Sequence, residues 1–342
     1  MATEVPSATP GATQPADSVR QASLADRFAV PGMSVSTPVG RAAAAILVHK
    51  AQPIFELAEK AASGRDMAAV HDMRVASRRT RETLSLFAGC YPVSSFDRWE
   101  LVVRRVTKTL GRVRDADVFL EEFRSLVPAA KTEAERVALA WLIGAREGSR
   151  DALVKRMRRE LGHMEVTGMR DPFSRWARRP RGLPGIHEPV SALAADAVSA
   201  RITALYAHLP AACDEANSLA QHAMRIDAKK LRYCVETFAP CYGPEFDTLY
   251  PVLKAFQDEL GEIHDRDVFV EAVREVERDC SAAGAGVVDE GLEAVVADLL
   301  AERAARFKRF SRLAVEWPEP RMREALVSAI CEAGELEACP GS

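Results

Sequence analysis

The feature that most constrains the fold of this 342-residue chain is an internal repeat. The segment HDMRVASRRTRETLSLF (71–87) aligns without a gap with HAMRIDAKKLRYCVETF (222–238), and LGRVRDADVFLEEF (110–123) aligns with LGEIHDRDVFVEAV (260–273). The first pair is separated by 151 residues (222 − 71) and the second by 150 (260 − 110). Two matches in the same order at nearly the same separation indicate a tandem duplication of one structural unit.

Both copies of the unit are predicted to be helical. The chain is rich in Ala, Leu, Arg and Glu, and only 6% of its residues are aromatic, which favours helices over sheets. Helical periodicity begins near Val39 and resumes from about Val190 to Leu336. The Pro- and Gly-rich stretch 170–190 separates the two tracts and predicts a linker.

These patterns define the expected domain organisation. We expect an all-α fold made of two helical, four-helix-bundle-like halves, residues 38–187 and residues 188–338. Residues 1–37 are rich in Pro, Thr, Ser and Ala and are expected to form a disordered N-terminal tail.

The first repeated segment of each half forms an amphipathic helix when its residues are placed at roughly 100° intervals. One side is apolar, with Met73, Ala76, Thr80, Leu84 and Phe87 in the first copy and Met224, Leu231, Val235 and Phe238 in the second. The opposite side is basic, with His71, Arg74, Arg78 and Arg81 in the first copy and His222, Arg225, Lys229 and Arg232 in the second. Arg79 and Lys230 lie on a flank of each helix. We therefore expect each helix to pack with one side and to present a row of cations with the other.

A row of like charges is unusual for a helix face that only meets solvent. Solvated faces normally mix acidic and basic residues, because like charges one turn apart repel each other. The whole chain has a net charge of only −3, so positive charge is concentrated on these two faces. We interpret them as anion-binding faces.

Phosphate is the anion that these side chains suit best. The planar guanidinium of arginine donates two parallel hydrogen bonds to phosphate and keeps its charge. Side chains one turn apart are about 5–6 Å apart, so successive arginines can hold neighbouring phosphates of one chain. The histidine that begins each row has an ordinary pKa of about 6.5, so it is able to donate a hydrogen bond when neutral and to add charge when protonated.

The second repeated segment predicts further cations but no metal site. Arg104, Lys108 and Lys254 lie upstream of the two LG motifs and are included as candidate anion-binding residues. Each copy also contains an Asp-x-Asp pair, Asp115/Asp117 and Asp265/Asp267. On a helix, residues i and i+2 point about 200° apart and cannot both hold one ion. We therefore expect each aspartate to pair with a local arginine or to cap a turn.

The doubled pattern resembles that of the CHAD family, the "conserved histidine α-helical domain". The resemblance rests on HDMRVASRRTR, HAMRIDAKKLR, LGRVRDADVF and LGEIHDRDVF, and it covers roughly residues 38–340. It implies two helical bundles related by approximate twofold symmetry, with basic helices facing a central cleft or pore. It also implies binding of inorganic polyphosphate and association with polyphosphate granules. Carried over by position, the contacts would be His71, Arg74, Arg78, Arg79 and Arg81, with His222, Arg225, Lys229, Lys230 and Arg232 in the second copy.

The chain departs from the family pattern at three points. The second copy has Lys229 and Lys230 where the first has arginines, so phosphate contacts there are expected to be less bidentate. Asp227 takes the place of Ala76 on the apolar side, which the pattern does not explain. Many relatives also carry a triphosphate-tunnel catalytic domain with an ExExK strand, and this motif is missing here. We therefore expect a binding protein without catalytic residues.

Two other classes of function remain as alternatives. The first is a phosphoryl-transfer or phosphohydrolase enzyme, because HDMR places an acidic residue after a helical histidine, although no glycine-rich nucleotide loop accompanies it. The second is a nucleic-acid-binding protein, which the basic rows favour less because they lack interleaved aromatic residues for base stacking.

The remaining expectations concern location and partners. Seven scattered cysteines without a CxxC pair are typical of reduced thiols in the cytoplasm. The N-terminus lacks a basic region followed by an apolar block, and no stretch reaches the roughly 18 apolar residues of a membrane span. We expect a cytoplasmic protein associated with polyphosphate granules, with polyphosphate and granule proteins as partners and with no membrane, metal or cofactor. No oligomeric state is assigned.

Overall fold

The computed structural model describes residues 23–181, 185–283 and 286–330, with the side chains of 279–287 left undescribed. Every regular element in these ranges is a helix, which confirms the predicted all-α class. None of the described helices is long and apolar enough to cross a membrane.

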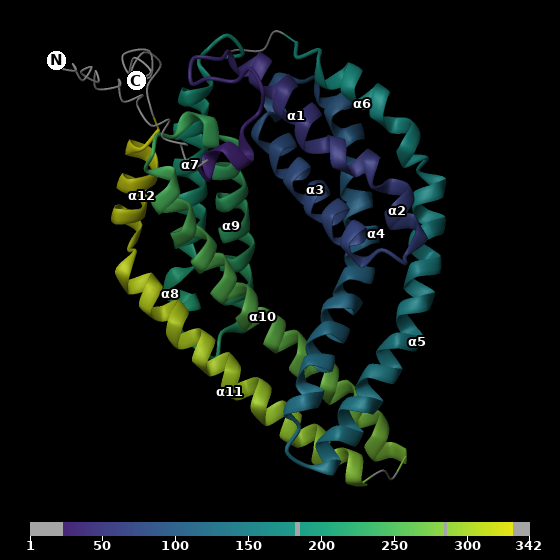
Figure 1. Ribbon diagram of the computed structural model, residues 1–342. Coiled ribbons are helices and arrows are strands. Elements are labelled where there is room, and N and C mark those ends of the chain that lie inside the picture. Colours follow the sequence, from purple (N-terminus) through teal and green to yellow (C-terminus); the bar gives the residue numbers. More distant parts are fainter. Residues whose placement is uncertain (1–22, 182–184, 284–285, 331–342) are drawn as a thin grey trace, which may run out of the picture.

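The elements follow the repeat along the chain. The first half contains α1 (Val39–Glu56), α2 (Ala58–Ser63), α3 (Met67–Leu86), α4 (Val93–Leu126), α5 (Glu133–His163) and α6 (Arg170–Ala177). The second half contains α7 (Val190–Ala207), α8 (Leu209–Ala212), α9 (Ser218–Thr237), α10 (Phe246–Ala283), α11 (Gly286–Glu316) and α12 (Glu319–Ser328). Short 3₁₀ helices include η1 (Ala25–Phe28), η2 (Ala88–Cys90), η3 (Val127–Ala129), η4 (Val166–Met169) and η5 (Ala239–Cys241). In Figure 1 the two groups lie side by side in the upper part, and α4, α5, α10 and α11 converge below.

The two basic helices begin with matching caps. Asp66 accepts a hydrogen bond from the Ala69 N–H of α3 (2.9 Å), and Asn217 accepts one from the Ala220 N–H of α9 (3.0 Å). The capping residues are 151 positions apart (217 − 66), like the helices that they start. A polar side chain at this position satisfies a backbone donor that the first turn leaves free, so it fixes where each helix begins.

The starts of α1 and α7 are joined by reciprocal hydrogen bonds. The Val39 N–H donates to the Glu188 carbonyl, and the Val190 N–H donates to the Thr37 carbonyl, both at 2.9 Å. These donors and acceptors are again 151 positions apart (190 − 39 and 188 − 37). Equivalent positions of the two halves therefore contact each other at this junction in the same way.

The apolar sides of α3 and α9 lie in the core of the upper part. The predicted apolar residues of both helices are buried, and Phe87 and Phe238, which end the two helices, contact each other with ring centroids 6.0 Å apart. This core takes side chains from both halves. The predicted apolar stripes are thus confirmed, and they pack partly against each other.

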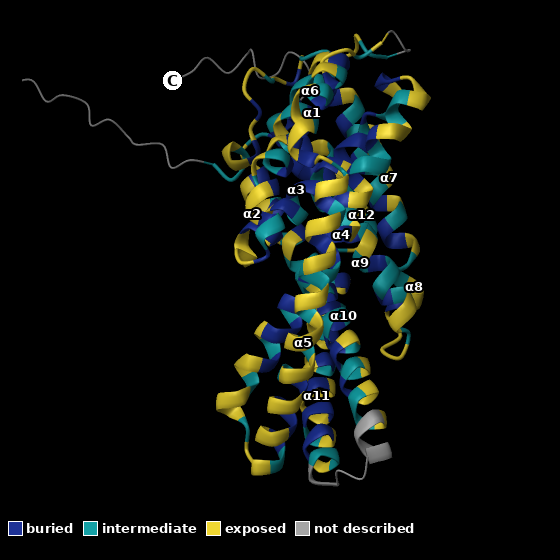
Figure 2. Ribbon diagram, turned by 90° about the vertical axis from the view of Figure 1, so that its right-hand side faces the viewer, coloured by how far each residue is buried: buried dark blue, intermediate teal, exposed yellow. Residues whose placement is uncertain are grey.

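A second core lies in the lower bundle, where two helices of each half meet. Its buried members are Phe119, Phe123, Ala138, Leu139, Leu142, Phe269, Val273, Leu292, Val295, Val296 and Leu299, from α4, α5, α10 and α11. Figure 2 shows that the molecule is elongated and that this bundle is narrower than the upper part. Because each half supplies one face, neither half completes this core alone.

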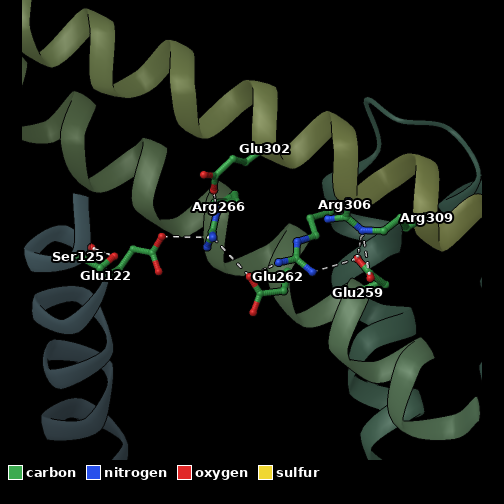
Figure 3. A network of polar contacts seen from close by, with 8 residues as sticks. All are labelled: Glu122, Ser125, Glu259, Glu262, Arg266, Glu302, Arg306 and Arg309. Atoms are coloured by element: carbon green, nitrogen blue, oxygen red, sulfur yellow. Dashed lines mark hydrogen bonds and ion pairs between the residues drawn. The ribbon is translucent and has the colours of Figure 1, made fainter. Parts of the chain in front are cut away.

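Ion pairs reinforce the junction above this second core (Figure 3). Arg266 of α10 contacts Glu122 of α4 (3.2 Å), Glu262 of its own helix (3.4 Å) and Glu302 of α11 (2.7 Å). Arg306 of α11 contacts Glu262 as well (3.6 Å). Arg266 is nearly buried, so these carboxylates offset the cost of removing its charge from water.

Two expectations about loose segments are wrong within the described residues. Residues 23–37 were expected to belong to the disordered tail, but Phe28, Val30 and Val35 are buried in the upper core. The predicted linker 170–190 begins with α6, whose Phe173 is fully buried against α1 and α4 residues. In both segments a few apolar side chains suffice to anchor a short piece of chain. Residues 1–22 of the predicted tail lie outside the described residues.

Candidate functional site

A cavity of about 990 Å³ lies between the two halves. Its lining comes from α3 and α4 of the first half and from α9 and α10 of the second, together with one residue of α7. The cationic members are Arg74, Arg78, Arg81, Arg114, Arg201, Arg225, Lys229 and Lys230, and the carboxylates are Glu82, Glu100, Asp115 and Asp265. His71 and His264 line it as well. Eight cations thus face four carboxylates, so the cavity has a surplus of positive charge.

The first arginine of each basic row holds the same position in its half. Arg74 contacts Asp115 (3.2 Å) and Arg225 contacts Asp265 (3.4 Å). Burial is the main cause that lowers the pKa of both guanidinium groups, and the paired aspartate opposes it. The Nε atoms of both arginines are buried without a hydrogen-bond partner in the described structure. Each guanidinium therefore keeps donor capacity beyond its aspartate.

The next residue of each row lacks a carboxylate partner. Arg78 and Lys229 are equivalent positions (229 − 78 = 151), and neither forms an ion pair with any described residue. The Arg78 guanidinium lies over the ring of Tyr233 from the other half, 5.7 Å from its centroid. Burial, with Arg225 and Arg78 nearby, lowers the pKa of Lys229 to about 6. This pair of residues is where positive charge is least compensated.

The two motif histidines lie at the edge of this cluster. Nδ1 of His222 is 3.0 Å from Nδ1 of His264, so one ring donates a hydrogen bond to the other. Burial lowers the pKa of His71 and of His222, and burial together with Arg225 lowers the pKa of His264 to about 3. The lowered pKa favours the neutral, hydrogen-bonding form of these histidines, which corresponds to the first of the two roles considered for them. His71 and His264 line the cavity, whereas the predicted contact His222 is not among its lining residues and contacts His264 instead.

Two predicted ligand contacts lie outside the cavity, in a buried ion cluster. Arg79 of α3 contacts Glu236 (2.9 Å), and Arg232 contacts the same carboxylate (3.1 Å). The Tyr250 hydroxyl donates a hydrogen bond to Glu236 (2.8 Å). Glu236 is only 1% exposed, so this buried carboxylate holds both arginines away from the cavity. As cavity residues, Arg79 and Arg232 were predicted wrongly.

Lys230 and Arg81 line the cavity but have carboxylate neighbours. Lys230 contacts Asp227 (2.7 Å). The Asp227 carboxylate is also within hydrogen-bond distance of Nε2 of His208 (2.9 Å). This explains an aspartate on the apolar side, because local cations surround it and it is only half-buried. Arg81 is 3.8 Å from Glu100 and is 41% exposed, so it remains accessible.

The three cations predicted from the second motif also lie outside the cavity. Arg104, Lys108 and Lys254 are exposed and are not among its lining residues. Arg104 contacts Glu100 (3.9 Å) and Lys254 contacts Asp258 (2.5 Å), each one turn along its own helix. Arg104 and Lys254 thus form ordinary solvated surface pairs, and Lys108 is an exposed cation.

Three basic residues of the cavity were missed by the sequence reasoning, namely Arg114, Arg201 and His264. Arg114 and His264 directly precede the first aspartate of each repeated Asp-x-Asp pair (264 − 114 = 150), so the repeat did contain a signal for them. Arg201 lies in α7, outside the repeated segments, so no such signal pointed to it. Its guanidinium forms an ion pair with Glu82 of α3 (2.5 Å).

The Asp-x-Asp prediction is confirmed. The first aspartate of each pair contacts Arg74 or Arg225, as described above. The second aspartates contact arginines of the next long helix: Asp117 is 2.5 Å from Arg150 of α5, and Asp267 is 2.5 Å from Arg303 of α11. No cluster of metal-binding side chains is found among the described residues.

The fold and the site define an all-helical protein with a cavity whose cations come from both of its helical groups. The CHAD domain model matches residues 49–274, which is more than half of the chain, so the protein belongs to the CHAD domain family.

Solved structures show the same fold. The crystal structure of the CHAD domain from the plant Ricinus communis matches with a TM-score of 0.64 and 21% identity, over 87% of this chain and 95% of the other. PptA from Streptomyces chartreusis matches with a TM-score of 0.64 and 17% identity, over 81% of this chain and 99% of the other. No curated protein sequence matches the chain.

Proposed function

We propose that this protein binds inorganic polyphosphate in the cavity between its halves and does not catalyse a reaction on it. The observation that carries the proposal is the pair formed by Arg78 and Lys229, which are partly buried, face like charges and lack a carboxylate. Without a partner, burial disfavours positive charge at these two positions, as the lowered pKa of Lys229 shows, and a bound anion of high charge density favours the charged form of both side chains.

We further propose that the halves are related by approximate twofold symmetry, so that one phosphate chain contacts both α3 and α9. The reciprocal bonds between Val39, Val190 and their acceptors support this relation. The matching pairs of Arg74 with Asp115 and of Arg225 with Asp265 support it at the cavity itself.

The chemistry of the lining favours a chain of phosphates over a single one. The cavity extends over several helical turns, and cations about 5–6 Å apart along one helix suit successive phosphates. Arg74 and Arg225 each contact their aspartate through a single terminal nitrogen, so the other terminal nitrogen is able to bind phosphate while the aspartate is held. Family membership supports polyphosphate as the ligand and polyphosphate granules in the cytoplasm as the location.

The proposal is tested by a pair of matched double variants. Arg78→Ala/Lys229→Ala removes two cavity cations, and Arg104→Ala/Lys108→Ala removes two exposed cations of the first half. Hydrogen bonds to charged groups contribute about 1.5–3 kcal/mol each, so the cavity variant should bind long-chain polyphosphate at least about 100-fold more weakly. Its plot of log affinity against log salt should also be flatter by about two counterions, by analogy with other polyanions.

The control variant should bind like the unaltered protein within about twofold, since exposed single charges contribute little. Equal affinities of the two variants would overturn the proposed site. Release of phosphate from polyphosphate during incubation would instead support an enzyme. Displacement of polyphosphate by RNA at equal phosphate concentration would support nucleic-acid binding.

A further inference from the structure

The cavity extends to one side only. Beyond the central cations, one end is lined by residues of α3 and α4 of the first half and by single residues of α7 and α9; we call it the open arm. Its members are Arg81, Ser85, Phe96, Glu100, Arg201 and Lys230. The centre, in contrast, is lined by equivalent residues from both halves, such as Arg74 with Arg225 and Asp115 with Asp265. The repeat therefore predicts a second arm that the cavity lacks.

The residues of this second arm are present but do not line the cavity. They are found 151 positions away along α1, α3, α7 and α9 and 150 positions away along α4 and α10. In the same order as above they are Arg232, Glu236, Phe246, Tyr250, Lys50 and Arg79. We call this set the closed arm. Like the open arm, it contains three cations.

The N-terminal segment, residues 23–37, occupies the closed arm. The ring of Phe28 contacts those of Phe246 and Tyr250, with centroids 6.0 and 5.2 Å apart. The Lys50 Nζ atom lies 5.6 Å from the centroid of the Phe28 ring, and the guanidinium of Arg79 lies 5.8 Å from it. Phe28 is 9% exposed, so one aromatic side chain fills the place that is empty in the other arm.

No described residue covers the open arm in this way. The separation of 151 residues places Arg179 at the position equivalent to Phe28 (179 − 28), and Arg179 is exposed. Hydrogen bonds to α10 also hold the N-terminal segment in place on the side of the closed arm. Both the Ser23 hydroxyl and the Leu24 N–H donate to Asp247 (3.1 and 2.8 Å). The equivalent Asp97 (247 − 150) is exposed like Asp247, but its carboxylate has no such contact with a described residue.

The cover leaves an imbalance of charge beneath it. Lys50, Arg79 and Arg232 share Glu236 as the carboxylate of the closed arm. Burial and Arg79 lower the pKa of Lys50 to about 8, which reflects this surplus. A phosphate chain in contact with these cations would compensate them better than the ring of Phe28 does.

We propose that the closed arm is a second polyanion-binding arm and that residues 23–37 act as a plug that restricts a phosphate chain to the open arm. This inference rests on the proposed function and extends it. Removal of the plug joins the closed arm to the central cations, so that the site holds a longer stretch of polyphosphate.

The test compares the full chain with a variant lacking residues 1–30 and with a control lacking only residues 1–22. Binding of long-chain polyphosphate and of tripolyphosphate is measured at several salt concentrations. Without the plug, the affinity for the long chain should rise several-fold, and the salt dependence should steepen by about two counterions. Tripolyphosphate binding should stay unchanged, because the short chain is satisfied by the central cations. The control lacking residues 1–22 should behave like the full chain.

A second pair of variants keeps the test valid if the deletion impairs folding. The double variant Phe28→Ala/Asp247→Ala loosens the plug. The control is the single variant Asp97→Ala, which keeps Phe28 and changes the equivalent aspartate on the side of the open arm. Only the first variant should gain affinity for the long chain. Unchanged affinity and salt dependence in folded plug variants would overturn this inference while leaving the proposed function intact. Absence of polyphosphate binding by the full chain would instead overturn the proposed function.

Discussion

The helices α3 and α9 start with matching caps and carry nearly the same pattern of side chains, yet they use it differently. Arg81 of α3 lines the cavity, whereas the equivalent Arg232 of α9 is held by the buried Glu236. Arg78 carries a permanent charge at the centre, whereas the equivalent Lys229 is able to lose its proton. The difference teaches that the position on a helix sets the direction of a side chain, and that the neighbouring chain segments decide what it binds.

The strongest test of this asymmetry concerns Glu236. Glu236→Gln should reduce the free energy of unfolding by about 3 kcal/mol, because it leaves Arg79 and Arg232 without their buried counter-charge. Ser85→Ala at the equivalent, exposed position (236 − 85 = 151) should change it by less than about 0.5 kcal/mol. Denaturant unfolding monitored by circular dichroism measures both changes. Similar losses would show that the two arms contribute equally to stability.

A smaller difference is expected between the second aspartates of the two Asp-x-Asp pairs. Asp117 is fully buried against Arg150, so Asp117→Asn should cost about 2 kcal/mol of unfolding free energy. Asp267 is 27% exposed, and its partner Arg303 also donates to Gln221 (2.8 Å). Asp267→Asn should therefore cost only about 1 kcal/mol. The same unfolding measurement would contradict the comparison if the second variant were the less stable one.

The last comparison concerns the pair Arg78 and Lys229. Its effect is a change in the affinity for polyphosphate with pH. In the empty cavity the pKa of Lys229 is lowered to about 6, and a bound polyanion raises it again. Above pH 6 binding is therefore accompanied by proton uptake, and affinity for polyphosphate should rise up to about tenfold per pH unit as the pH falls from about 9 to about 7.5. Below about pH 6 the free amine is already protonated, so this dependence levels off.

Titration calorimetry in buffers of different ionisation enthalpy measures that uptake directly. Lys229→Arg makes the two halves alike and should abolish the pH dependence in this window, because arginine stays charged. His264→Asn serves as the control, since the pKa of His264 is lowered to about 3 and its ring is neutral throughout. Full proton uptake retained by Lys229→Arg would assign the linkage to another group.

The helical fold and the centre of the site could be predicted from local pattern. The apolar sides of α3 and α9 are buried, from Met73 and Leu84 in one half to Met224 and Leu231 in the other. Arg74, Arg78, Arg225 and Lys229 line the cavity together. Periodicity determined these features because they depend on which face of a helix meets the core, and the repeat showed that two such faces exist.

The remainder depended on contacts between distant parts of the chain. The place of Arg79 is decided by Glu236, which lies 157 residues further on (236 − 79). Arg201 reaches the cavity through an ion pair with Glu82 of the other half. Phe28 stands in a segment whose composition is typical of disorder, and the aromatic pocket formed by Phe246 and Tyr250 helps to order it. Such partners leave no trace in local sequence patterns.

The lower bundle has a consequence for the origin of the molecule. A chain with a single copy of the repeat would expose Phe119, Phe123 and their neighbours on α4 and α5, because the other wall of that core belongs to α10 and α11. A one-copy ancestor with this architecture could hide that surface only by pairing with an identical chain. If the chain arose by fusion of two such copies, each copy was then free to change without the other. The lysine at position 229 and the plug over a single arm are changes that a homodimer would have had to make twice.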